Sequence, residues 1–549
     1  MLKGKKKKLC AIALALALGI STLVGCGESG GSSKVKQEMV HNLGTEVKTI
    51  DPALNNAVDG SIVIANAFEG LYRTDESTEA KPGVAKDCDI SSDGLTYTFH
   101  LRDDAKWSDG QQVTSKDFAY AWKRALDPKT AADYAFQLYY IKGAEEFNTG
   151  KGTVDNLGIK VIDDVTLEVT LAKPTPYFLE ITAFPTLMPL REDIVSAHPD
   201  SWTLDPSTYI TNGAFKMEEY NMKDSYVFVK NDNYYDKDKV KLDKLTFKMI
   251  TDSTTAYASL KNGEITSIDQ VPTQEIESGE QEGLVKDYPA LSTYYYCLNV
   301  GNHTDKIDPA VKAALSKKEV RHALNLAIDR TKITNEIVKG GRKPAYSFVP
   351  ESMEVNGEEF SDKHYWDETK FDIEGAKKLL ADAGYPNGEG LPTFEISYNN
   401  NVEYNKLVAE AIQQMWTQIG VKVSLKSEEW TVFQDSRKNG KYEIARHQWT
   451  GDYNDPMTFL DMWMTGLGNN DAKFSNAQYD ELIRKSQLER DSKTRIEYLK
   501  QAEAIFMDEM PILPIFYDTL VKGVDPKVKD IRVAPLGQVY FTRAYMSES

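Results

Sequence analysis

Cysteine is scarce in this chain, because only four of its 549 residues are cysteines. Cys10 and Cys26 lie in or just after an apolar run near the start, which leaves Cys88 and Cys297 for the rest of the chain. Two cysteines permit one disulfide and do not require it. No Cys-x-x-Cys pair is present, so neither a thiol-redox centre nor a zinc site of that type is expected.

Catalytic and metal-binding motifs are also missing. The sequence has no Walker loop, no His-Glu-x-x-His pair and no Gly-x-Ser-x-Gly elbow in which the serine follows a strand and opens a helix. The acidic run 231–238 lacks the glycine of an EF-hand loop and is interrupted by lysines, so it predicts a solvated turn rather than a calcium site. The histidines have no ligand spacing. They are His41, His100, His198, His303, His322, His364 and His447. We therefore expect a protein that binds no metal or cofactor and is not an enzyme. The alternative is a hydrolase whose catalytic residues are far apart in the sequence and come together only in the fold.

Basic residues are in deficit, since 65 lysines and arginines face 83 acidic residues and the formal net charge is -18. Nucleic-acid binding depends on clustered cations that neutralise phosphates. The composition therefore excludes nucleic acid as an expected partner and favours a body that lies outside the cytoplasm.

Long apolar runs and linkers are rare as well. After the first 25 residues no apolar stretch approaches the roughly 20 residues that a membrane-spanning helix needs. A chain of 549 residues exceeds what one core usually holds, so two or three lobes are expected. Because no linker separates them, we expect the chain to pass between the lobes more than once.

The first 25 residues have the composition of a secretory signal. Lys3 and Lys5–Lys8 form a charged segment, and Leu9–Leu18 form an apolar one without acidic residues. The following Leu23-Val24-Gly25-Cys26 resembles a bacterial lipobox, which predicts cleavage before Cys26 and a lipid on that cysteine. Residues 26–38 then read as a flexible tether. Loss of the five lysines takes the net charge from -18 to -23.

Strands and helices alternate over much of the remaining chain, which predicts α/β lobes. Thr114 and Asp117 form a capping box that predicts the start of a helix, and Ser316 and Glu319 form a second box. A helix over 63–71 is expected to close at Gly70. Further helices are expected over 376–383 and 407–419. Strands are expected over 40–43, 95–101, 167–171, 226–229, 245–250 and 421–425.

The stretch 446–456, Arg-His-Gln-Trp-Thr-Gly-Asp-Tyr-Asn-Asp-Pro, combines a strand end with a turn that carries two carboxylates among aromatic rings. Such a loop can present a shielded anion to a cationic ligand group, by charge pairing and by attraction to ring faces. Asp, Asn, Gly and Pro are also ordinary turn residues, so a plain surface turn is the alternative on local grounds.

Ordered motifs along the chain carry a resemblance to a known family. They are Asn42-Leu43-Gly44-Thr45-Glu46, Phe68-Glu69-Gly70-Leu71, Pro82-Gly83-Val84-Ala85, 93–99 (Asp-Gly-Leu-Thr-Tyr-Thr-Phe), Asn212-Gly213-Ala214-Phe215, Thr293-Tyr294-Tyr295-Tyr296, Ala327-Ile328-Asp329-Arg330, Ala383-Gly384-Tyr385-Pro386 and 449–456. With the lipobox they resemble the oligopeptide-binding lipoproteins of family 5 of the extracytoplasmic solute-binding proteins. The resemblance covers essentially the whole mature chain.

The resemblance implies an α/β Venus-flytrap fold of the periplasmic-binding-protein type. Two main lobes and an extra domain are expected to surround a ligand cleft. Domain I is expected to comprise 39–68, 209–291 and 517–549. Domain II is expected over 69–208 and domain III over 292–516. Several crossings between lobes agree with the absence of linkers.

The resemblance also implies the site residues. Asp452 matches the aspartate that pairs with the free amino terminus of a peptide, whose backbone binds as an added strand. Arg446 matches a partner for a ligand carboxylate. The remaining matches are pocket walls and cleft positions. They are Trp449, Trp430, Tyr453, Tyr134 and Val58. Asp455 is left as a turn residue before Pro456.

The chain departs from the enterobacterial members of the family at several positions. A cleft glutamate is replaced by Asn56, and a bridged cysteine pair is replaced by Ser292 and Thr450. A cleft histidine is replaced near Tyr404 and Asn405. The length and side chains of the peptide are therefore open, and the same fold could bind a dipeptide, a signalling peptide, a nickel complex or a sugar.

The resemblance implies partners and a location too. The expected protein is a monomer, held by lipid on the outer face of a Gram-positive cell membrane. It would deliver oligopeptides to the permease and ATPase subunits of an ABC importer.

Overall fold

The computed structural model describes residues 35–74, 80–301, 306–355, 357–360, 371–400 and 402–548. Residues 37–549 form one compact unit, separate from residues 1–36. The expected signal, the lipobox with Cys26 and most of the tether lie outside the described residues.

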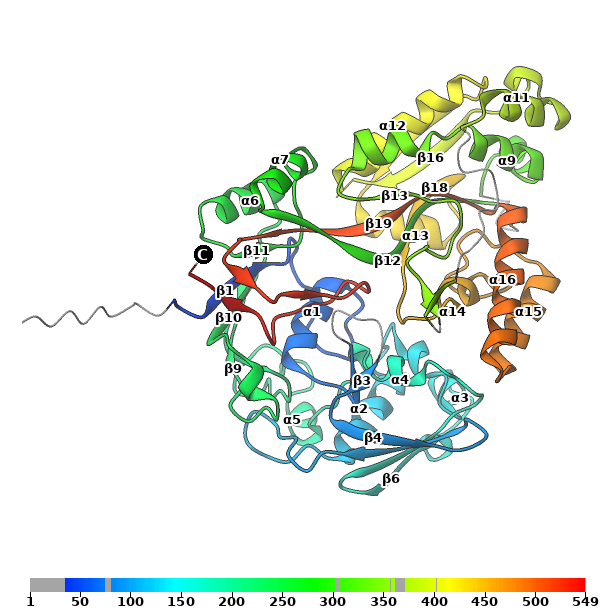
Figure 1. Ribbon diagram of the computed structural model, residues 1–549. Helices are drawn as coiled ribbons and strands as arrows, with labels where there is room; N and C mark the ends of the chain where they lie inside the picture. Colours follow the sequence, from blue (N-terminus) through cyan, green and yellow to red (C-terminus); the bar gives the residue numbers. More distant parts are fainter. Residues whose placement is uncertain are drawn as a thin grey trace, which may run out of the picture. The chain divides into compact units, whose positions relative to one another are not determined.

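A large mixed sheet runs through residues 37–549 (Figure 1). Its strand order is β17-β16-β18-β12-β19-β11-β1-β10-β9-β8, with β13 paired to β19. The bounds are β17 Val423–Glu428, β16 Phe394–Asn399, β18 Ile444–Thr450, β12 Val285–Leu298, β19 Ile512–Val524, β11 Ser267–Ile268, β1 Glu38–Asn42, β10 Lys244–Lys248, β9 Ser225–Lys230, β8 Phe215–Asn221 and β13 Lys343–Pro344.

Two long antiparallel strands, β12 and β19, join the two halves of this sheet. On one side β19 meets β11, which is followed by β1 and β10, and on the other side β12 meets β18. The β12–β19 register shifts between Pro289 and Thr293 and again between Tyr294 and Tyr295. Such irregularities increase the local twist, so the two halves of the sheet are twisted relative to each other.

A separate four-stranded antiparallel sheet lies in the 85–170 region, drawn with β4 and β6 in Figure 1. Its order is β4 (Ala85–Ile90), β5 (Thr96–Leu101), β7 (Thr166–Thr170) and β6 (Ile159–Asp163). β5 shows the expected alternation, with buried Tyr97, Phe99 and Leu101. The remaining strands pair as short hairpins. They are β2 (Tyr72–Arg73) with β3 (Lys81–Pro82), β14 (Glu354–Val355) with β15 (Glu358–Glu359), β20 (Val528–Lys529) with β23 (Tyr545–Met546), and β21 (Arg532–Val533) with β22 (Val539–Tyr540).

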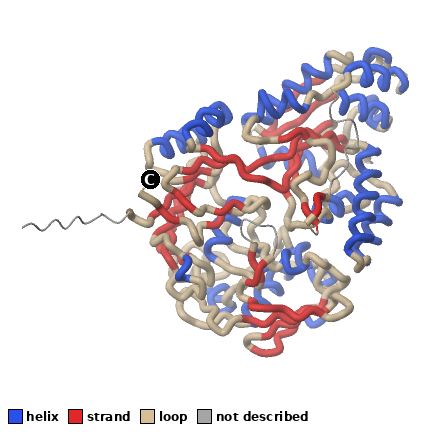
Figure 2. Tube along the Cα trace, in the orientation of Figure 1, coloured by secondary structure: helices blue, strands red, loops and turns tan. Residues whose placement is uncertain are grey.

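Helices lie beside both sheets (Figure 2). The α-helices are α1 Val58–Ala67, α2 Ser115–Leu126, α3 Ala144–Asn148, α4 Phe178–Ile181, α5 Glu192–Ala197, α6 Ser253–Lys261, α7 Ile276–Glu282, α8 Pro309–Leu315, α9 Lys318–Leu326, α10 Arg330–Lys332, α11 Ile373–Asp382, α12 Glu403–Thr417, α13 Trp430–Lys438, α14 Met457–Leu460, α15 Ala477–Leu488 and α16 Ser492–Glu509. The expected capping box at the start of α2 is present, and Asp117 accepts the backbone N–H of Thr114 at 2.7 Å.

The second expected capping box is absent. Ser316 closes α8 in a helical conformation and donates its hydroxyl to the carbonyl of Ala313 at 2.8 Å. α9 begins at Lys318, after Lys317, without a side-chain cap. The prediction at Ser316 is wrong because two short helices meet there, and the serine belongs to the end of the first.

Gly70 does not close a helix either, because α1 ends at Ala67 and Phe68 is already extended. A Cβ on Gly70 would lie 2.5 Å from the carbonyl oxygen of Thr182. The glycine is therefore needed for a close approach of two backbone segments rather than for a helix end.

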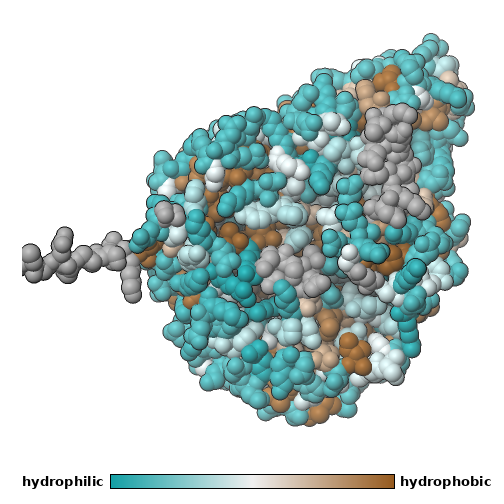
Figure 3. All heavy atoms as spheres, in the orientation of Figure 1, coloured by the Kyte–Doolittle hydropathy of each residue, from teal (hydrophilic) through white to brown (hydrophobic). Residues whose placement is uncertain are grey.

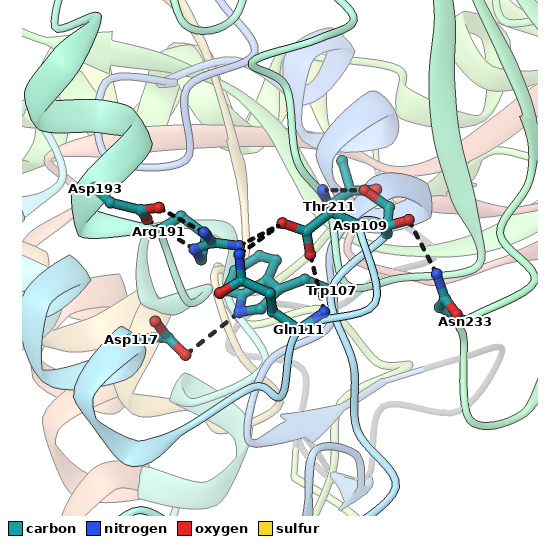
Figure 4. A network of polar contacts seen from close by, with 9 residues as sticks. Trp107, Asp109, Gln111, Asp117, Arg191, Asp193, Thr211 and Asn233 are labelled. Atoms are coloured by element: carbon teal, nitrogen blue, oxygen red, sulfur yellow. Dashed lines mark hydrogen bonds and ion pairs between the residues drawn. The ribbon is translucent and has the colours of Figure 1, made fainter.

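A polar network links distant parts of the chain near the start of α2 (Figure 4). Arg191 pairs with Asp109 at 2.8 Å and with Asp193 at 2.5 Å. Ser108 next to Asp109 accepts the backbone N–H of Thr211 on its hydroxyl at 3.1 Å. The bond between Thr211 and Ser108 joins segments that the resemblance assigns to domains I and II, whereas the pairs of Arg191 lie within domain II. The three-domain division itself stays a prediction.

The surface agrees with the acidic, hydrophilic composition: on the face drawn in Figure 3 hydrophilic residues predominate, and hydrophobic ones form small patches. Cys88 and Cys297 are both free thiols, so the disulfide left open by the sequence is not formed. No helix among the described residues is both long and apolar enough to cross a membrane. Within the same residues no cluster of His, Cys, Asp and Glu side chains is arranged to hold a metal ion.

Candidate ligand-binding site

Hydrogen bonds to Thr458 of α14 hold the loop that follows β18. The indole N–H of Trp449 donates to the carbonyl of Thr458 at 2.8 Å, and the backbone N–H of Asp452 donates to the Thr458 hydroxyl at 3.0 Å. Gly451 donates its N–H to the carbonyl of Leu291 on β12 at 2.8 Å. The loop therefore holds the Asp452 carboxyl in a defined position.

Asp455 has a structural role in this loop. Arg495 of α16 donates two hydrogen bonds to its carboxylate, at 2.8 and 2.6 Å, and both side chains are buried. Asp455 also accepts the N–H of Met457 at 2.9 Å, at the start of α14. The expectation that Asp455 belongs to the turn is confirmed, and the arginine partner is new.

Asp452 differs from Asp455 because no cation pairs with it among the described residues. Its side-chain partner is the neutral amide of Gln137, whose Nε2 donates to Oδ2 at 2.9 Å. Gln137 is buried and lies on the 3₁₀ helix η1, Ala135–Leu138. Burial raises the pKa of Asp452 to about 7, and the hydrogen bond from Gln137 opposes this rise only in part. The carboxyl is half-buried and electrostatically unsatisfied.

Several tyrosines lie around the Asp452 loop. Tyr453 stacks on Tyr177 with ring centroids 4.6 Å apart and 4° between the planes, and its hydroxyl lies 3.1 Å from that of Tyr140. The charge of Asp452 is the largest cause of a raised pKa at Tyr134, so that hydroxyl lies close to the carboxylate. The ring of Tyr134 stacks on Phe184 at 5.3 Å.

A second acid, Asp461, lies near Asp452 at the start of the 3₁₀ helix η8 (Asp461–Trp463). Burial and then the charge of Asp452 raise the pKa of Asp461 to about 7. Lys173 lies close enough to favour the ionised form of Asp461, and it donates to Gln487 at 2.8 Å. Burial lowers the pKa of Lys173. The site thus contains two carboxyls that oppose each other's ionisation.

Arg446 lies in a different network, on the face of β18 that also carries Gln448. Its Nη2 donates to Gln448 at 2.6 Å and its Nη1 to Asn399 at 3.4 Å, while the guanidinium lies 4.8 Å from the centre of the Tyr294 ring. Nε is buried without a hydrogen-bond partner. No carboxylate pairs with Arg446 in the part of the chain that the structure describes.

A carboxylate in this network, that of Asp518, already has partners. Asp518 accepts Nε2 of Gln448 at 2.6 Å and Nε of Arg342 at 2.6 Å. The guanidinium of Arg342 lies 5.2 Å from the centre of the Tyr404 ring. Tyr404, near which the resemblance implies a replaced histidine, therefore lies beside the arginine-containing network.

The two tryptophans occupy separate places. Alternation along β18 puts Trp449 with His447 on the face opposite Arg446. This agrees with the stacking of His447 on Tyr295 at 4.8 Å. Trp430 begins α13, is half-buried and packs against Phe433 with centroids 6.4 Å apart.

Asn56 and Val58 precede and begin α1. Asn56 donates to Asp133 at 2.7 Å, and Asp133 is the neighbour of Tyr134 in the chain. Val58 is 50 % exposed. A Cβ on Gly537, in the turn of the β21–β22 hairpin, would lie 3.3 Å from Val58.

Comparison with known proteins identifies the family. The model of the bacterial extracellular solute-binding proteins, family 5, matches residues 79–471. The chain belongs to this family. It is 38% identical over 530 residues to the oligopeptide-binding protein OppA of Bacillus subtilis (strain 168), with 94% of each chain covered.

Solved structures of other members of the family share the fold. A periplasmic oligopeptide-binding protein, OppAIV, from Borrelia burgdorferi has 34% sequence identity and a TM-score of 0.80, over 92% of this chain and 99% of that one. OppA of Haemophilus influenzae in complex with RPPGFSPFR has 32% identity and a TM-score of 0.78, over 94% and 99%. The expected α/β fold of the periplasmic-binding-protein type is confirmed.

The structure of this solute-binding protein brings only some of the expected site residues together. Asp452, Tyr453 and Tyr134 form one cluster, with Asn56 linked to it through Asp133. Arg446 belongs to a second network, and no direct interaction joins Trp430 to either among the described residues. Sequence reasoning missed several members of the first cluster because they come from segments about 300 residues away from Asp452. They are Gln137, Tyr140, Lys173 and Tyr177, and the nearer Asp461 was missed as well.

Proposed function

We propose that this solute-binding protein captures oligopeptides by their backbone and their charged ends and delivers them to an ABC importer. The main support for the proposal is that two ionisable side chains, those of Asp452 and Arg446, have no partner of opposite charge among the described residues. Asp452 has a neutral amide as its side-chain partner, and Arg446 has no carboxylate partner among the described residues. A zwitterionic peptide supplies both missing groups, an ammonium and a carboxylate.

Charge pairing explains why the two residues suit these roles. A ligand ammonium near Asp452 favours the ionised carboxylate, which burial otherwise disfavours. A guanidinium offers a planar fork of donors that matches a carboxylate. Truncation of one member of a buried charge pair costs about 2 to 5 kcal/mol, because the other charge is left buried and unpaired.

The other expected residues would shape the space around the peptide. Tyr453 and Trp449 would form walls beside the amino terminus, and Trp430 would form the wall of a further pocket. Tyr134, with Val58 and Asn56, would contribute from the facing segments. Backbone pairing gives affinity without reading side chains, so such a cleft tolerates many sequences.

Domain closure would accompany binding. Residues 39–68, 209–291 and 517–549 would form domain I, 69–208 domain II and 292–516 domain III. A ligand that contacts more than one domain stabilises the closed arrangement by its differential affinity. The bonds of Gln137 to Asp452 and of Tyr140 to Tyr453 already join the second and third of these.

The proposed location follows from the lipobox. A lipid on Cys26 would hold a monomeric protein on the outer face of a Gram-positive cell membrane, where the permease and ATPase subunits of an importer receive the peptide. The tether over 26–38 would let the folded part reach them.

Isothermal titration calorimetry tests the site directly. Trialanine is titrated into the wild type, Asp452→Asn and a surface control, Asp164→Asn, whose carboxylate is 65% exposed. We expect the affinity to fall at least about thirtyfold in Asp452→Asn, which corresponds to the lower limit of about 2 kcal/mol, and to be unchanged in the control. N-acetylated trialanine should bind the wild type equally poorly. Unchanged affinity in Asp452→Asn would remove this residue from the role.

Other solutes and other chemistry are distinguished by two further measurements. Thermal-shift assays with peptides of increasing length, nickel complexes and sugars identify the ligand class, because only a bound ligand raises the melting temperature. Incubation of peptides with the protein followed by mass spectrometry tests the hydrolase alternative. Cleaved products would contradict a purely binding role.

A further inference from the structure

A pocket lies at the carboxyl end of α1, against the C-terminal hairpin β21–β22. Asn66 of α1 holds this hairpin in place: its Nδ2 donates to the carbonyl of Val539 at 2.7 Å and its Oδ1 accepts the N–H of Phe541 at 2.8 Å. The pocket has an empty volume of about 590 Å³, including solvent at its mouth. Its lining includes no residue of the Asp452 cluster or of the Arg446 network.

The lining of this pocket is positively charged in an acidic protein. Among the described residues that line it, three are arginines, Arg73, Arg532 and Arg543, and one is a carboxylate, Glu69. Glu69 is already engaged, because the hydroxyls of Tyr234 and Tyr235 donate to it. The described residues of the lining therefore carry a formal charge of +2, whereas that of the whole chain is -18.

One of the three arginines has no counter-ion in the part of the chain that the structure describes. Arg73 lies 3.7 Å from Glu69 and 3.8 Å from Asp236, and Arg532 lies 3.4 Å from Asp530. Arg543 is half-buried, and it makes no hydrogen bond or ion pair with any residue that the structure describes. Its five N–H donors are thus available to an acceptor from solution.

Another part of the lining is apolar. Phe68 and Met188 are 2% and 5% exposed, and Ala65 and Ala183 lie beside them in the pocket wall. The hydroxyl of Tyr540 is held 3.0 Å from that of Thr74. A ligand here would meet guanidinium donors at one part of the wall and hydrocarbon at another. Small-molecule sites commonly combine these features.

We propose that this pocket is a second ligand site, which takes a small organic carboxylate. The carboxylate would accept hydrogen bonds from Arg543, and a short apolar chain would contact Phe68 and Met188. Inorganic oxyanions share the charge and the acceptor oxygens but cannot use the apolar wall. The site is independent of the proposed peptide site, so the two proposals can fail separately.

Calorimetry with butanoate, and with phosphate and sulfate in parallel, tests this proposal at fixed ionic strength in chloride. We expect saturable binding of butanoate to the wild type and a loss of at least about tenfold in Arg543→Gln, since hydrogen bonds to a charged group are lost. Arg484→Gln is the matched control, because Arg484 is 55% exposed on α15 and does not line the pocket. It should bind butanoate as the wild type does.

Several outcomes would overturn the proposal. No saturable binding to the wild type, or equal affinity in Arg543→Gln, would remove the site. Binding of phosphate or sulfate without butanoate would overturn the organic carboxylate. Hydrogen–deuterium exchange on the wild type needs no variant: butanoate should protect residues 532–543 and leave α15 unchanged, and absence of that protection would contradict the site.

Discussion

Asp452 and Asp455 are only three residues apart, but the fold places their carboxylates in different electrostatic environments. Asp455 receives two hydrogen bonds from Arg495 and is fully compensated. Asp452 receives one hydrogen bond from the neutral Gln137, and its pKa is raised to about 7. A buried ion pair holds structure together, whereas a poorly compensated carboxyl is suited to receive a charge from a ligand.

The raised pKa predicts how peptide binding depends on pH. The ammonium of a peptide requires ionised Asp452, so the affinity for trialanine should rise by up to about tenfold per pH unit between pH 5 and 7. It should level off near pH 7 and fall again above about pH 8, where the free amine of the peptide loses its proton. Calorimetry from pH 5.5 to 8.5 measures this profile. Asp452→Asn should bind weakly without the rise, and a wild type with constant affinity would contradict the prediction.

The free energy of unfolding of the ligand-free protein should change with pH in the opposite direction to the peptide affinity. An unfolded aspartate ionises near pH 4, whereas the folded protein keeps Asp452 protonated up to about pH 7. The folded state then binds more protons over this interval, so the free energy of unfolding falls as the pH rises from about 4 to 7. Because the carboxyl is half-buried, we expect a contribution on the order of 2 kcal/mol. Urea denaturation at pH 5 and pH 7.5 should show a smaller loss in Asp452→Asn than in the wild type; an equal loss would argue against the shift.

Removal of Asp455 should have a different effect. Asp455→Ala leaves the Arg495 guanidinium buried and unpaired, so we expect a loss of about 3 to 5 kcal/mol in the free energy of unfolding. Asp452→Ala should cost little or stabilise the protein, since it removes an uncompensated carboxyl. Urea denaturation of both variants measures the difference. Equal destabilisation by the two substitutions would show that the residues are not distinguished in this way.

At the scale of single elements, the register of β12 and β18 has a direct chemical consequence. Ser292 lies opposite Thr450, and their hydroxyl oxygens are 3.0 Å apart. Opposed residues of antiparallel strands have Cα separations that suit a disulfide. These are also the positions at which the sequence resemblance indicated a replaced cysteine pair.

We therefore predict that the double variant Ser292→Cys/Thr450→Cys forms a disulfide under oxidising conditions. The bridge should raise the free energy of unfolding by about 2 to 4 kcal/mol, because it closes a long loop in the unfolded chain. Mass spectrometry detects the loss of two hydrogens, and denaturation with and without reductant measures the gain. The single variant Ser292→Cys is the control and should not respond to reductant. Cys88 and Cys297 stay free in either case. Thiols that remain free at both introduced positions, 292 and 450, in the oxidised double variant would contradict the register.

The close approach at Gly70 gives a second prediction for an element boundary. Gly70→Ala places a methyl group 2.5 Å from the carbonyl oxygen of Thr182, so the two segments must separate. We expect a loss of about 1 to 3 kcal/mol, as for other overpacked positions. Gly468→Ala is the matched control, because its Cβ would meet no atom within 4 Å. Thermal denaturation of the two variants should therefore differ, and equal melting temperatures would contradict the inferred contact.

Local patterns could be predicted from the sequence, and distant pairings could not. The capping box of Thr114 and Asp117 and the alternation of β5 depend on residues close together in the chain, and both are confirmed. The Ser316 box failed because a preceding helix uses that serine. Gln137 is 315 residues from Asp452, and no periodicity links them. The loop with its two acids could thus be singled out, but the electrostatic environment of each acid required the fold.

At the scale of the whole molecule, the lipobox predicts covalent lipid at Cys26. A chain expressed in a Gram-positive host and fed an alkyne fatty acid should carry the label in the wild type and lose it in Cys26→Ala. Trialanine should bind both forms equally, because every residue of the proposed peptide site belongs to the compact unit 37–549. Label in Cys26→Ala, or none in the wild type, would contradict lipidation at this residue.

The order of strands in the large sheet also determines when the sheet can be completed during synthesis of the chain. The residues of β1 are synthesised first, but its neighbours β10 and β11 follow more than 200 residues later in the chain. β11 and β12 both pair with β19, which lies at 512–524 and is synthesised near the end. Contacts between such distant segments form slowly. The central sheet therefore cannot be completed until nearly the whole polypeptide has been synthesised. A chain that stays unfolded for so long suits export through a narrow translocation channel, in which a finished sheet would not fit.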